Sequence, residues 1–132
     1  MDYIKTIASS LIQSYRSAAT RVDFVPDMQS VGLNLDQAIP CGLIINELVS
    51  NALKYAFKGR KKGVLTVVLR EEDGEIILAV KDDGVGLPKD FAYEKNNSLG
   101  IQLVYALLEQ LDASMKVNQS NGTEFFISFR RK

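Results

Sequence analysis

Two polar motifs contain the side chains of this sequence that could do chemistry. The first, Asp82-Asp83-Gly84-Val85-Gly86, follows the apolar run Ile76–Val80 after one residue, Lys81. A carboxylate at the end of such a strand can accept a hydrogen bond from an exocyclic amine of a ligand, and the glycines let the backbone pass close to the ligand's rings. Because Asp-Gly is also among the strongest turn signals, we interpret this motif on its own as a plain turn.

The second motif is a polar stripe on a predicted helix between Ile39 and Phe57. Each helical residue advances about 100°, so Ser50, Asn51 and Lys54 fall within about 60° of Glu47. The stripe therefore combines a carboxylate, an amide and an ammonium, which is a set suited to Mg²⁺ and phosphate. A solvated helix face is the commoner origin of such a stripe, and on the helix alone we favour that explanation.

Ser98-Leu99-Gly100 opens a further predicted helix, whose free N–H groups and dipole suit a phosphate. Glycine in a helix costs about 1 kcal/mol relative to alanine, which indicates that another group approaches the backbone at Gly100. A neighbouring strand packed against Gly100 would explain it as well. Asn121-Gly122-Thr123 is typical of a hairpin turn that leads into a strand.

Hydrophobic periodicity predicts the elements that must position these motifs. They are, in order, a helix at Asp2–Ala19, a strand at Val22–Val25 closed by Pro26, a helix with Asp36 as its N-cap that runs to about Phe57, strands at Gly63–Leu69 and Glu75–Lys81 around a turn at Glu72-Asp73-Gly74, a helix at Leu99–Leu111, and strands at Ser114–Gln119 and Thr123–Arg130. This order predicts an α+β fold, a two-layer α/β sandwich with one sheet and helices on one face.

Composition bounds the class of protein. The chain has 132 residues, enough for one domain whose core needs no disulfide or metal. Lys plus Arg number 16 and Asp plus Glu number 16, so no overall charge draws the protein to nucleic acid or to a membrane surface. No apolar run approaches the roughly 20 residues of a membrane helix, and no signal peptide is recognisable. We expect a cytoplasmic location with no membrane insertion of this chain, which could belong to a longer protein whose other parts are in the membrane.

Histidine is absent from the sequence, and there is a single cysteine, Cys41. The absence of histidine excludes Ser-His-Asp and Cys-His catalytic machinery and histidine-based metal sites within this chain. A single cysteine forms no internal disulfide and no thiolate zinc site. Because Cys41 lies between Pro40 and Gly42, we expect it to be a small buried residue.

Taken in order, the motifs resemble those of the catalytic, ATP-binding domain of sensor histidine kinases, within the superfamily that includes gyrase, the Hsp90 chaperones and the MutL mismatch-repair proteins. The matching segments are 46–55 with the N box, 83–86 with the first glycine box, 98–100 with the second, and 122–123 with the closing motif. The resemblance covers about Val22 to Phe129 and is nearest to the two-component subgroup with a variant dimerisation domain. It implies a Bergerat-type fold, in which a mixed sheet with helices on one face encloses an ATP pocket.

At the phosphate end of that pocket, the resemblance implies that Glu47 polarises or orients the phosphoryl acceptor. Asn51 would coordinate Mg²⁺ and Lys54 would touch phosphate. The second glycine box keeps only its last glycine, Gly100, which would make room for the phosphates beside Ser98 and Leu99. Catalysis by positioning and charge neutralisation agrees with what is needed for phosphoryl transfer.

At the adenine end, the resemblance implies that Asp83 accepts a hydrogen bond from the adenine amino group. Gly84 and Gly86 would make room for the base, and Thr123 would contact the base region. Tyr55, in the last position of the N box, is included among the nucleotide-binding residues.

The missing histidine divides the predicted reaction between this chain and a partner. The resemblance implies a domain that donates phosphate to a histidine-bearing dimerisation domain, on the same or a partner chain, with a response regulator downstream. Residues 1–20 are expected to be the residual helix of the upstream dimerisation region, and residues 21–132 the catalytic domain. The intact protein would be a phosphoprotein.

Two other functions remain open at this point. A serine kinase of the anti-sigma-factor type phosphorylates a partner protein and needs no histidine of its own. A non-catalytic nucleotide-binding interaction module would keep the fold without transferring phosphate, although the presence of Glu47, Asn51, Lys54 and Asp83 argues against it.

Overall fold

The computed structural model describes residues 21–29, 31–52, 62–84, 99–119 and 122–132. Its elements in chain order are β1 (Arg21–Met28), α2 (Leu35–Asn51), β2 (Lys62–Glu72), β3 (Glu75–Asp82), α3 (Leu99–Leu111), β4 (Ser114–Asn118) and β5 (Thr123–Arg130). This order confirms the prediction from the first strand onward. The predicted helix at 2–19, and the end of the predicted long helix beyond Ala52, lie outside the described residues.

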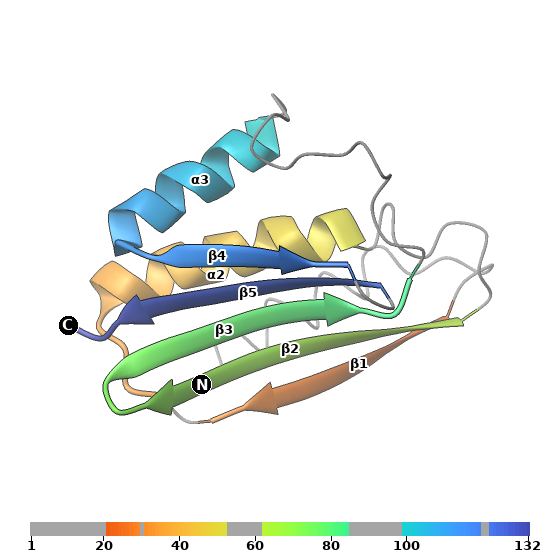
Figure 1. Ribbon diagram of the computed structural model, residues 1–132, viewed down its shortest axis with the longest axis horizontal. Helices are drawn as coiled ribbons and strands as arrows, with labels where there is room; N and C mark the ends of the chain where they lie inside the picture. Colours follow the sequence, from red (N-terminus) through yellow and green to blue (C-terminus); the bar gives the residue numbers. More distant parts are fainter. Residues whose placement is uncertain (1–20, 30, 53–61, 85–98, 120–121) are drawn as a thin grey trace.

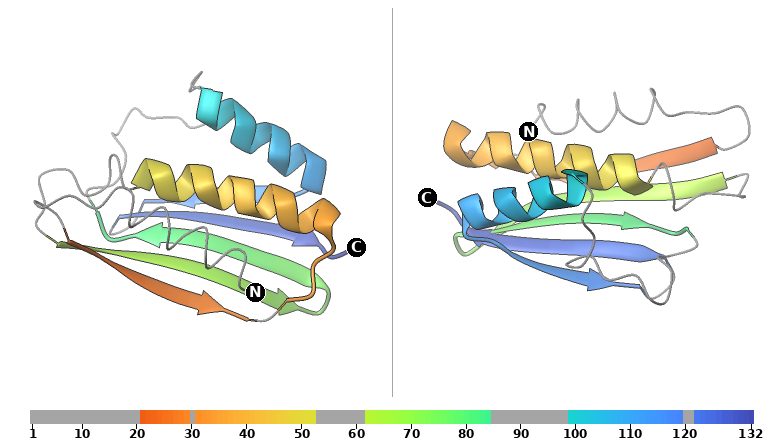
Figure 2. Two further views of the ribbon diagram at one scale, coloured as in Figure 1. Left: turned by 180° about the vertical axis from the view of Figure 1, so that it is seen from behind. Right: turned by 90° about the horizontal axis from the view of Figure 1, so that it is seen from above.

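In the described part of the chain, five strands form one mixed sheet in the order β1-β2-β3-β5-β4. β1 pairs with β2 in parallel, and the β2–β3, β3–β5 and β4–β5 pairs are antiparallel. A parallel pair needs a crossover connection, and α2 lies in the one between β1 and β2. α2 and α3 cover the same face of the sheet (Figures 1 and 2), so the expected two-layer α+β arrangement is confirmed.

Two local features explain how β2 turns into β3 and where β1 ends. Asp73 and Gly74 have φ values of 52° and 81°, as a two-residue hairpin turn requires, and they join β2 to β3 as predicted. β1 continues through Pro26 to Met28, so the predicted end of this strand is wrong. A proline lacks the N–H that a central strand would need, but β1 is an edge strand, where proline is tolerated.

The N-cap of α2 also differs from the prediction. Asn34, rather than Asp36, has the extended backbone of a cap, and its side chain accepts a hydrogen bond from the backbone N–H of Gln37 at 3.1 Å. Asp36 lies in the first turn, where its negative charge is favourable beside the positive end of the helix dipole.

The core lies between the sheet and the two covering helices. Its fully buried side chains come from α2, β2, β3, α3 and β5 and include Ile44, Ile45, Leu48, Val49, Leu65, Val67, Leu69, Ile76, Leu78, Val104 and Ile127. Cys41 is buried as expected, and this burial raises the pKa of its thiol to about 12. None of the helices in the described residues is long and apolar enough to cross a membrane.

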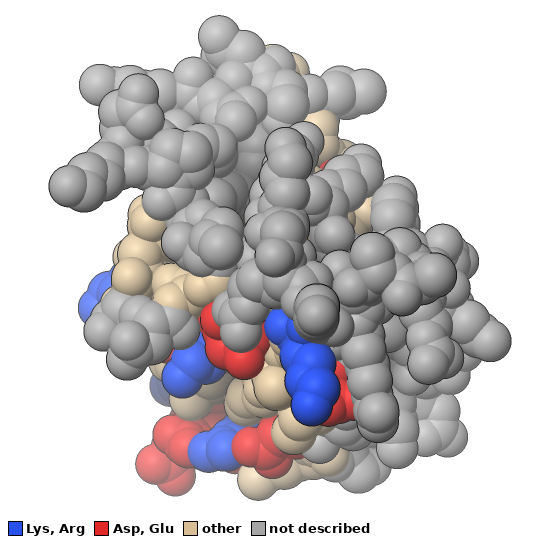
Figure 3. All heavy atoms as spheres, turned by 90° about the vertical axis from the view of Figure 1, so that its right-hand side faces the viewer, with Lys and Arg blue, Asp and Glu red and all other residues tan. Residues whose placement is uncertain are grey.

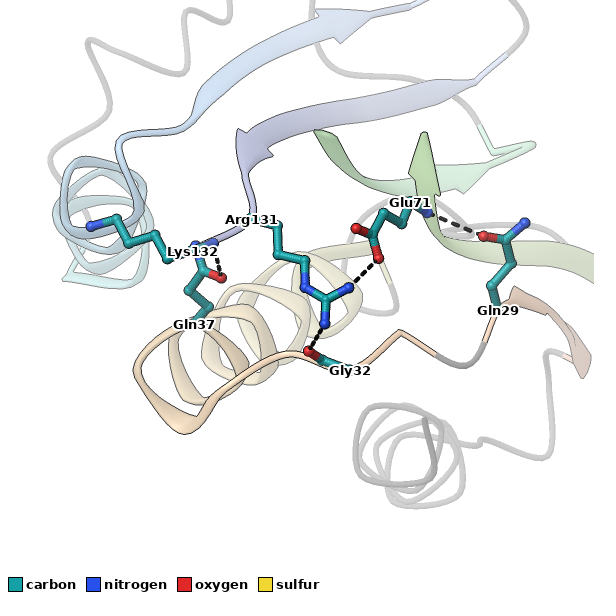
Figure 4. A network of polar contacts seen from close by, with 6 residues as sticks. All are labelled: Gln29, Gly32, Gln37, Glu71, Arg131 and Lys132. Atoms are coloured by element: carbon teal, nitrogen blue, oxygen red, sulfur yellow. Dashed lines mark hydrogen bonds and ion pairs between the residues drawn. The ribbon is translucent and has the colours of Figure 1, made fainter. Parts of the chain in front are cut away.

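Polar contacts fasten the start of α2 to the end of β5 (Figure 4). Gln37 is only 2% exposed; its Nε2 donates to the carbonyl oxygen of Arg130 at 2.9 Å, and its Oε1 accepts from the N–H of Lys132 at 3.1 Å. Arg131 donates to Glu71 at 2.6 Å and to the carbonyl oxygen of Gly32 at 2.7 Å. These contacts fix the N-terminal end of α2 over the sheet and so constrain where its other end lies.

Candidate functional site

The C-terminal end of β3 carries a buried carboxylate. Asp82 is 4% exposed, and its Oδ1 accepts hydrogen bonds from the N–H of Gly84 at 2.9 Å and of Thr123 at 3.3 Å. Thr123 is 3% exposed and is the partner of Asp82 in the β3–β5 pairing. A buried carboxylate is costly unless it is hydrogen-bonded, so these N–H groups both stabilise Asp82 and fix its position.

Asp83, the residue expected to bind adenine, lies differently. Its side chain is exposed, and its Oδ1 accepts from the N–H of Val64 at 2.8 Å while its own N–H donates to the carbonyl oxygen of Val64 at 3.2 Å. Asp83 thus continues the pairing of β3 with β2. Successive side chains of a strand alternate between the two faces of its sheet, so the side chains of Asp82 and Asp83 lie on opposite faces.

The alternation in β3 was a signal in the sequence that could have identified Asp82. Ile76, Leu78 and Val80 are buried against the helices, and Asp82 is next in that series. Extending the period of two from the apolar residues brings Asp82 to the helix-covered face and Lys81 and Asp83 to the opposite one.

Gly122 makes the approach of β5 to the end of β3 possible. Its φ is +109°, and a Cβ at this position would collide with the backbone carbonyl oxygen of Asp82. Both the conformation and the space therefore require glycine. The structure brings Asp82, Gly84, Gly122 and Thr123 together, although they lie in two distant segments of the sequence.

A second part of the site joins α2 to α3. Glu47 is half-buried on α2, and a Cβ built on Gly100, in the first turn of α3, would lie 2.5 Å from its Oε2. Asn51, also half-buried, is one helical turn beyond Glu47 on the same side of α2. The structure thus brings the carboxylate of the predicted stripe against the second glycine motif.

Both parts lie toward the same end of the molecule. On the right-hand side of Figure 1 lie the C-terminal ends of β3 and α2 and the N-terminal ends of β5 and α3. Figure 3 faces this end, and the Lys, Arg, Asp and Glu side chains of the described residues visible there are interspersed, without one sign gathering in a single patch.

Several expected site residues lie outside the described residues, namely Lys54, Tyr55, Gly86 and Ser98. Leu99 is the first residue of α3, and its side chain is likewise not described. Their assignments remain predictions from the sequence.

Comparison with known proteins identifies relatives that match most of this chain. Residues 36–132 match the family model described as histidine kinase-, DNA gyrase B- and HSP90-like ATPase. The chain is 36% identical over 96 residues to the sensor histidine kinase PdtaS of Mycobacterium tuberculosis, covering 70% of this chain and 19% of that protein. It is 30% identical over 118 residues to the blue-light-activated histidine kinase 2 of Erythrobacter litoralis, covering 89% of this chain and 34% of that protein.

A solved structure agrees with these sequence relatives. The histidine kinase domain of a blue-light-activated histidine kinase from Erythrobacter litoralis superposes with a TM-score of 0.91 at 27% identity, covering 98% of this chain and 60% of that one. The chain spans about a fifth of the length of PdtaS and about a third of the length of the blue-light-activated histidine kinase 2.

Substituting Gly122 tests the packing of β5 on β3. We expect Gly122→Ala to lower the free energy of unfolding by about 1–3 kcal/mol or more, because the backbone of Asp82 blocks the added methyl group and the φ is unfavourable for alanine. Denaturant unfolding measures this difference.

Gly74→Ala is the matched control. Gly74 also has a positive φ, but the atom nearest to an added Cβ is 3.7 Å away, on the Arg130 side chain, so only the conformational cost of alanine in the left-handed region, about 1–2 kcal/mol, applies. Equal losses in the two variants would show that the contact with Asp82 contributes nothing.

Proposed function

Because the chain belongs to the family of histidine kinase-, DNA gyrase B- and HSP90-like ATPases, we propose that it is the ATP-binding, phosphoryl-donating domain of a two-component sensor histidine kinase. The observation that carries this proposal is the buried Asp82 carboxylate, held by two backbone N–H groups at the end of the molecule where Glu47 also meets Gly100. The domain would occupy the cytoplasm, where ATP and a response regulator are available.

The adenine end of the proposed site contains Asp82 in place of Asp83. Asp82 is buried and fixed, which suits an acceptor that must distinguish an exocyclic amine from a carbonyl, whereas Asp83 is exposed and pairs with Val64. Gly84 and Thr123, whose N–H groups hold Asp82, would border the base, and Gly86 would make room for it.

The phosphate end consists of Glu47, Asn51 and the first turn of α3, with Lys54 and Ser98 assigned from the sequence. Mg²⁺ prefers hard oxygen donors and is commonly shared between one or two protein ligands and phosphates, so the amide oxygen of Asn51 beside the carboxylate of Glu47 fits this ion. When bound, the ion would neutralise phosphate charge. Glu47 would orient or polarise the acceptor imidazole, and Lys54 would contact phosphate.

The acceptor must come from outside this chain, which contains no histidine. We propose a histidine-bearing dimerisation domain, on the same polypeptide or a partner, as the immediate phosphoryl acceptor. A response regulator would take the phosphoryl group from that histidine.

A matched pair of variants tests the adenine assignment. Asp82→Asn keeps one acceptor oxygen and turns the other into an NH₂ donor, which would face the adenine amine with a second donor. We expect Mg-ATP to bind about 10- to 100-fold more weakly, as for the loss of a buried hydrogen bond worth 1–3 kcal/mol. Isothermal titration calorimetry on the folded variants measures the Kd.

Asp83→Asn is the control, with the same chemical change one residue away. Since Asp83 is exposed, we expect its Kd for Mg-ATP to stay within about a factor of 2 of the native value, which is the scale of surface substitutions. A loss confined to Asp83→Asn would restore the original assignment and contradict this one.

The chemical stability of the phosphorylated product tests the reaction class. In the complete natural polypeptide that contains this chain, or with an acceptor domain supplied in trans, label from γ-labelled Mg-ATP should appear in an acid-labile, base-stable form typical of phosphohistidine. The isolated chain should remain unlabelled. Acid-stable label on a separate partner would instead indicate a serine kinase, and Mg-ATP binding without any transfer would indicate an interaction module.

A further inference from the structure

Gly100 lies where α2 and α3 meet, and the carboxylate of Glu47 lies where a side chain at position 100 would be. A Cβ at position 100 would lie 2.5 Å from Oε2 of Glu47 and 3.5 Å from its Cδ. The first distance is too short for a carbon and an oxygen that are not bonded, whose favourable separation exceeds 3 Å. The Glu47 carboxylate therefore occupies the space that any side chain at position 100 would need.

We propose that Gly100 is a positioning residue for Glu47. Because position 100 has no side chain, the carboxylate can rest against the first turn of α3, which sets where it meets the phosphoryl acceptor. This inference rests on the proposed function, in which Glu47 acts at the transfer step. It gives Gly100 a role different from making room for the phosphates.

The backbone does not explain the glycine. Among the described glycines, positive φ values occur at Gly74 and Gly122, whereas Gly100 is in the helix α3. A helix loses up to about 1 kcal/mol by having glycine in place of alanine. Helix stability alone would thus favour alanine at position 100, and the contact with Glu47 supplies a reason for its absence.

A side chain added at position 100 should change the position of the Glu47 carboxylate more than it changes the stability of the fold. The obstructing atom at Gly100 is the end of a flexible, half-buried side chain that can rotate away. At Gly122, by contrast, the obstructing atoms belong to the backbone of Asp82 and Asp83 and cannot yield. An alanine at position 100 should therefore leave the fold intact and move the Glu47 carboxylate.

Two roles for Gly100 predict changes in different constants. If Gly100 makes room for phosphates, Gly100→Ala weakens nucleotide binding. If Gly100 positions Glu47, the variant binds Mg-ATP with nearly the native Kd but transfers the phosphoryl group slowly. Displacing a reacting group by about 1 Å can cost on the order of 100-fold in rate.

The experiment measures both constants, using the complete natural polypeptide for transfer and calorimetry for Mg-ATP binding. For Gly100→Ala we expect the single-turnover transfer rate at saturating Mg-ATP to fall about 10- to 100-fold, with native-like thermal stability. The Kd should stay nearly native. Gly32→Ala is the control, because its added Cβ would meet the Arg131 side chain, at 3.2 Å and outside the site, and its transfer rate should be unchanged. A weakened Kd with a native rate, or an unfolded Gly100→Ala, would overturn the proposal.

A double-mutant cycle adds a readout that a purely structural role would not move. Glu47→Asp shortens the side chain by one methylene, so its carboxylate no longer reaches position 100. In that background, we expect Gly100→Ala to cost little further transfer rate, a non-additive result typical of residues in contact. If the fold-changes of the two single variants simply multiply, Gly100 does not act through Glu47.

A crystal structure of Gly100→Ala separates this inference from the proposed function. The Glu47 carboxylate should be displaced from the first turn of α3, whatever reaction the protein performs. If the native polypeptide transfers no phosphate to histidine, the proposed function fails while this structural arm still stands. If the carboxylate keeps its native place in the variant, the positioning role is wrong even where transfer to histidine occurs.

Discussion

The structure around the site depends on one buried carboxylate and the N–H groups that satisfy it. Asp82 ends an apolar strand on the helix-covered face, where an unpaired carboxylate would be strongly unfavourable. Hydrogen bonds from Gly84 and Thr123 remove that cost, and they require the chain to turn after β3 and to begin β5 alongside it. Gly122 permits this close approach. A single polar group thus links the end of one strand, the following loop and the start of the neighbouring strand.

The remaining site residues are positioned by helices that the core holds in place. α2 buries Ile44, Ile45 and Leu48 against the sheet, and Gln37 ties its first turn to the end of β5. With that end fixed, Glu47 and Asn51 lie toward the same end of the molecule as Asp82 (Figure 1). α3 then contributes its first turn, where the Glu47 carboxylate occupies the space that a side chain at position 100 would need.

Sequence patterns predicted the elements well because each has a local signal. The Asp73-Gly74 turn, the apolar alternation of β2 and β3 and the periodicity of α3 depend on neighbours in the chain. The N-cap of α2 was missed because Asn34 and Asp36 are both good caps, and only the backbone conformation distinguishes them.

Two features of the site were not predicted from the sequence: the position of Asp82 on the inner face of the sheet, and the proximity of Glu47 to Gly100. Extending the alternation of β3 by one step would have favoured Asp82 over Asp83 on the inner face, so this information was present locally. The approach of Glu47 to Gly100 could not be predicted from a local pattern, because only the packing of α2 on α3 brings these two residues together. The strand order of the sheet is likewise a property of the tertiary fold.

The most direct test of the central claim is a crystal structure of this chain with Mg²⁺ and a non-hydrolysable ATP analogue. The account predicts the exocyclic amine of adenine at hydrogen-bond distance, about 2.7–3.2 Å, from the Asp82 carboxylate. The phosphates should lie toward Asn51 and the first turn of α3. Adenine bound against Asp83, or anywhere away from the Asp82–Thr123 contact, would contradict it.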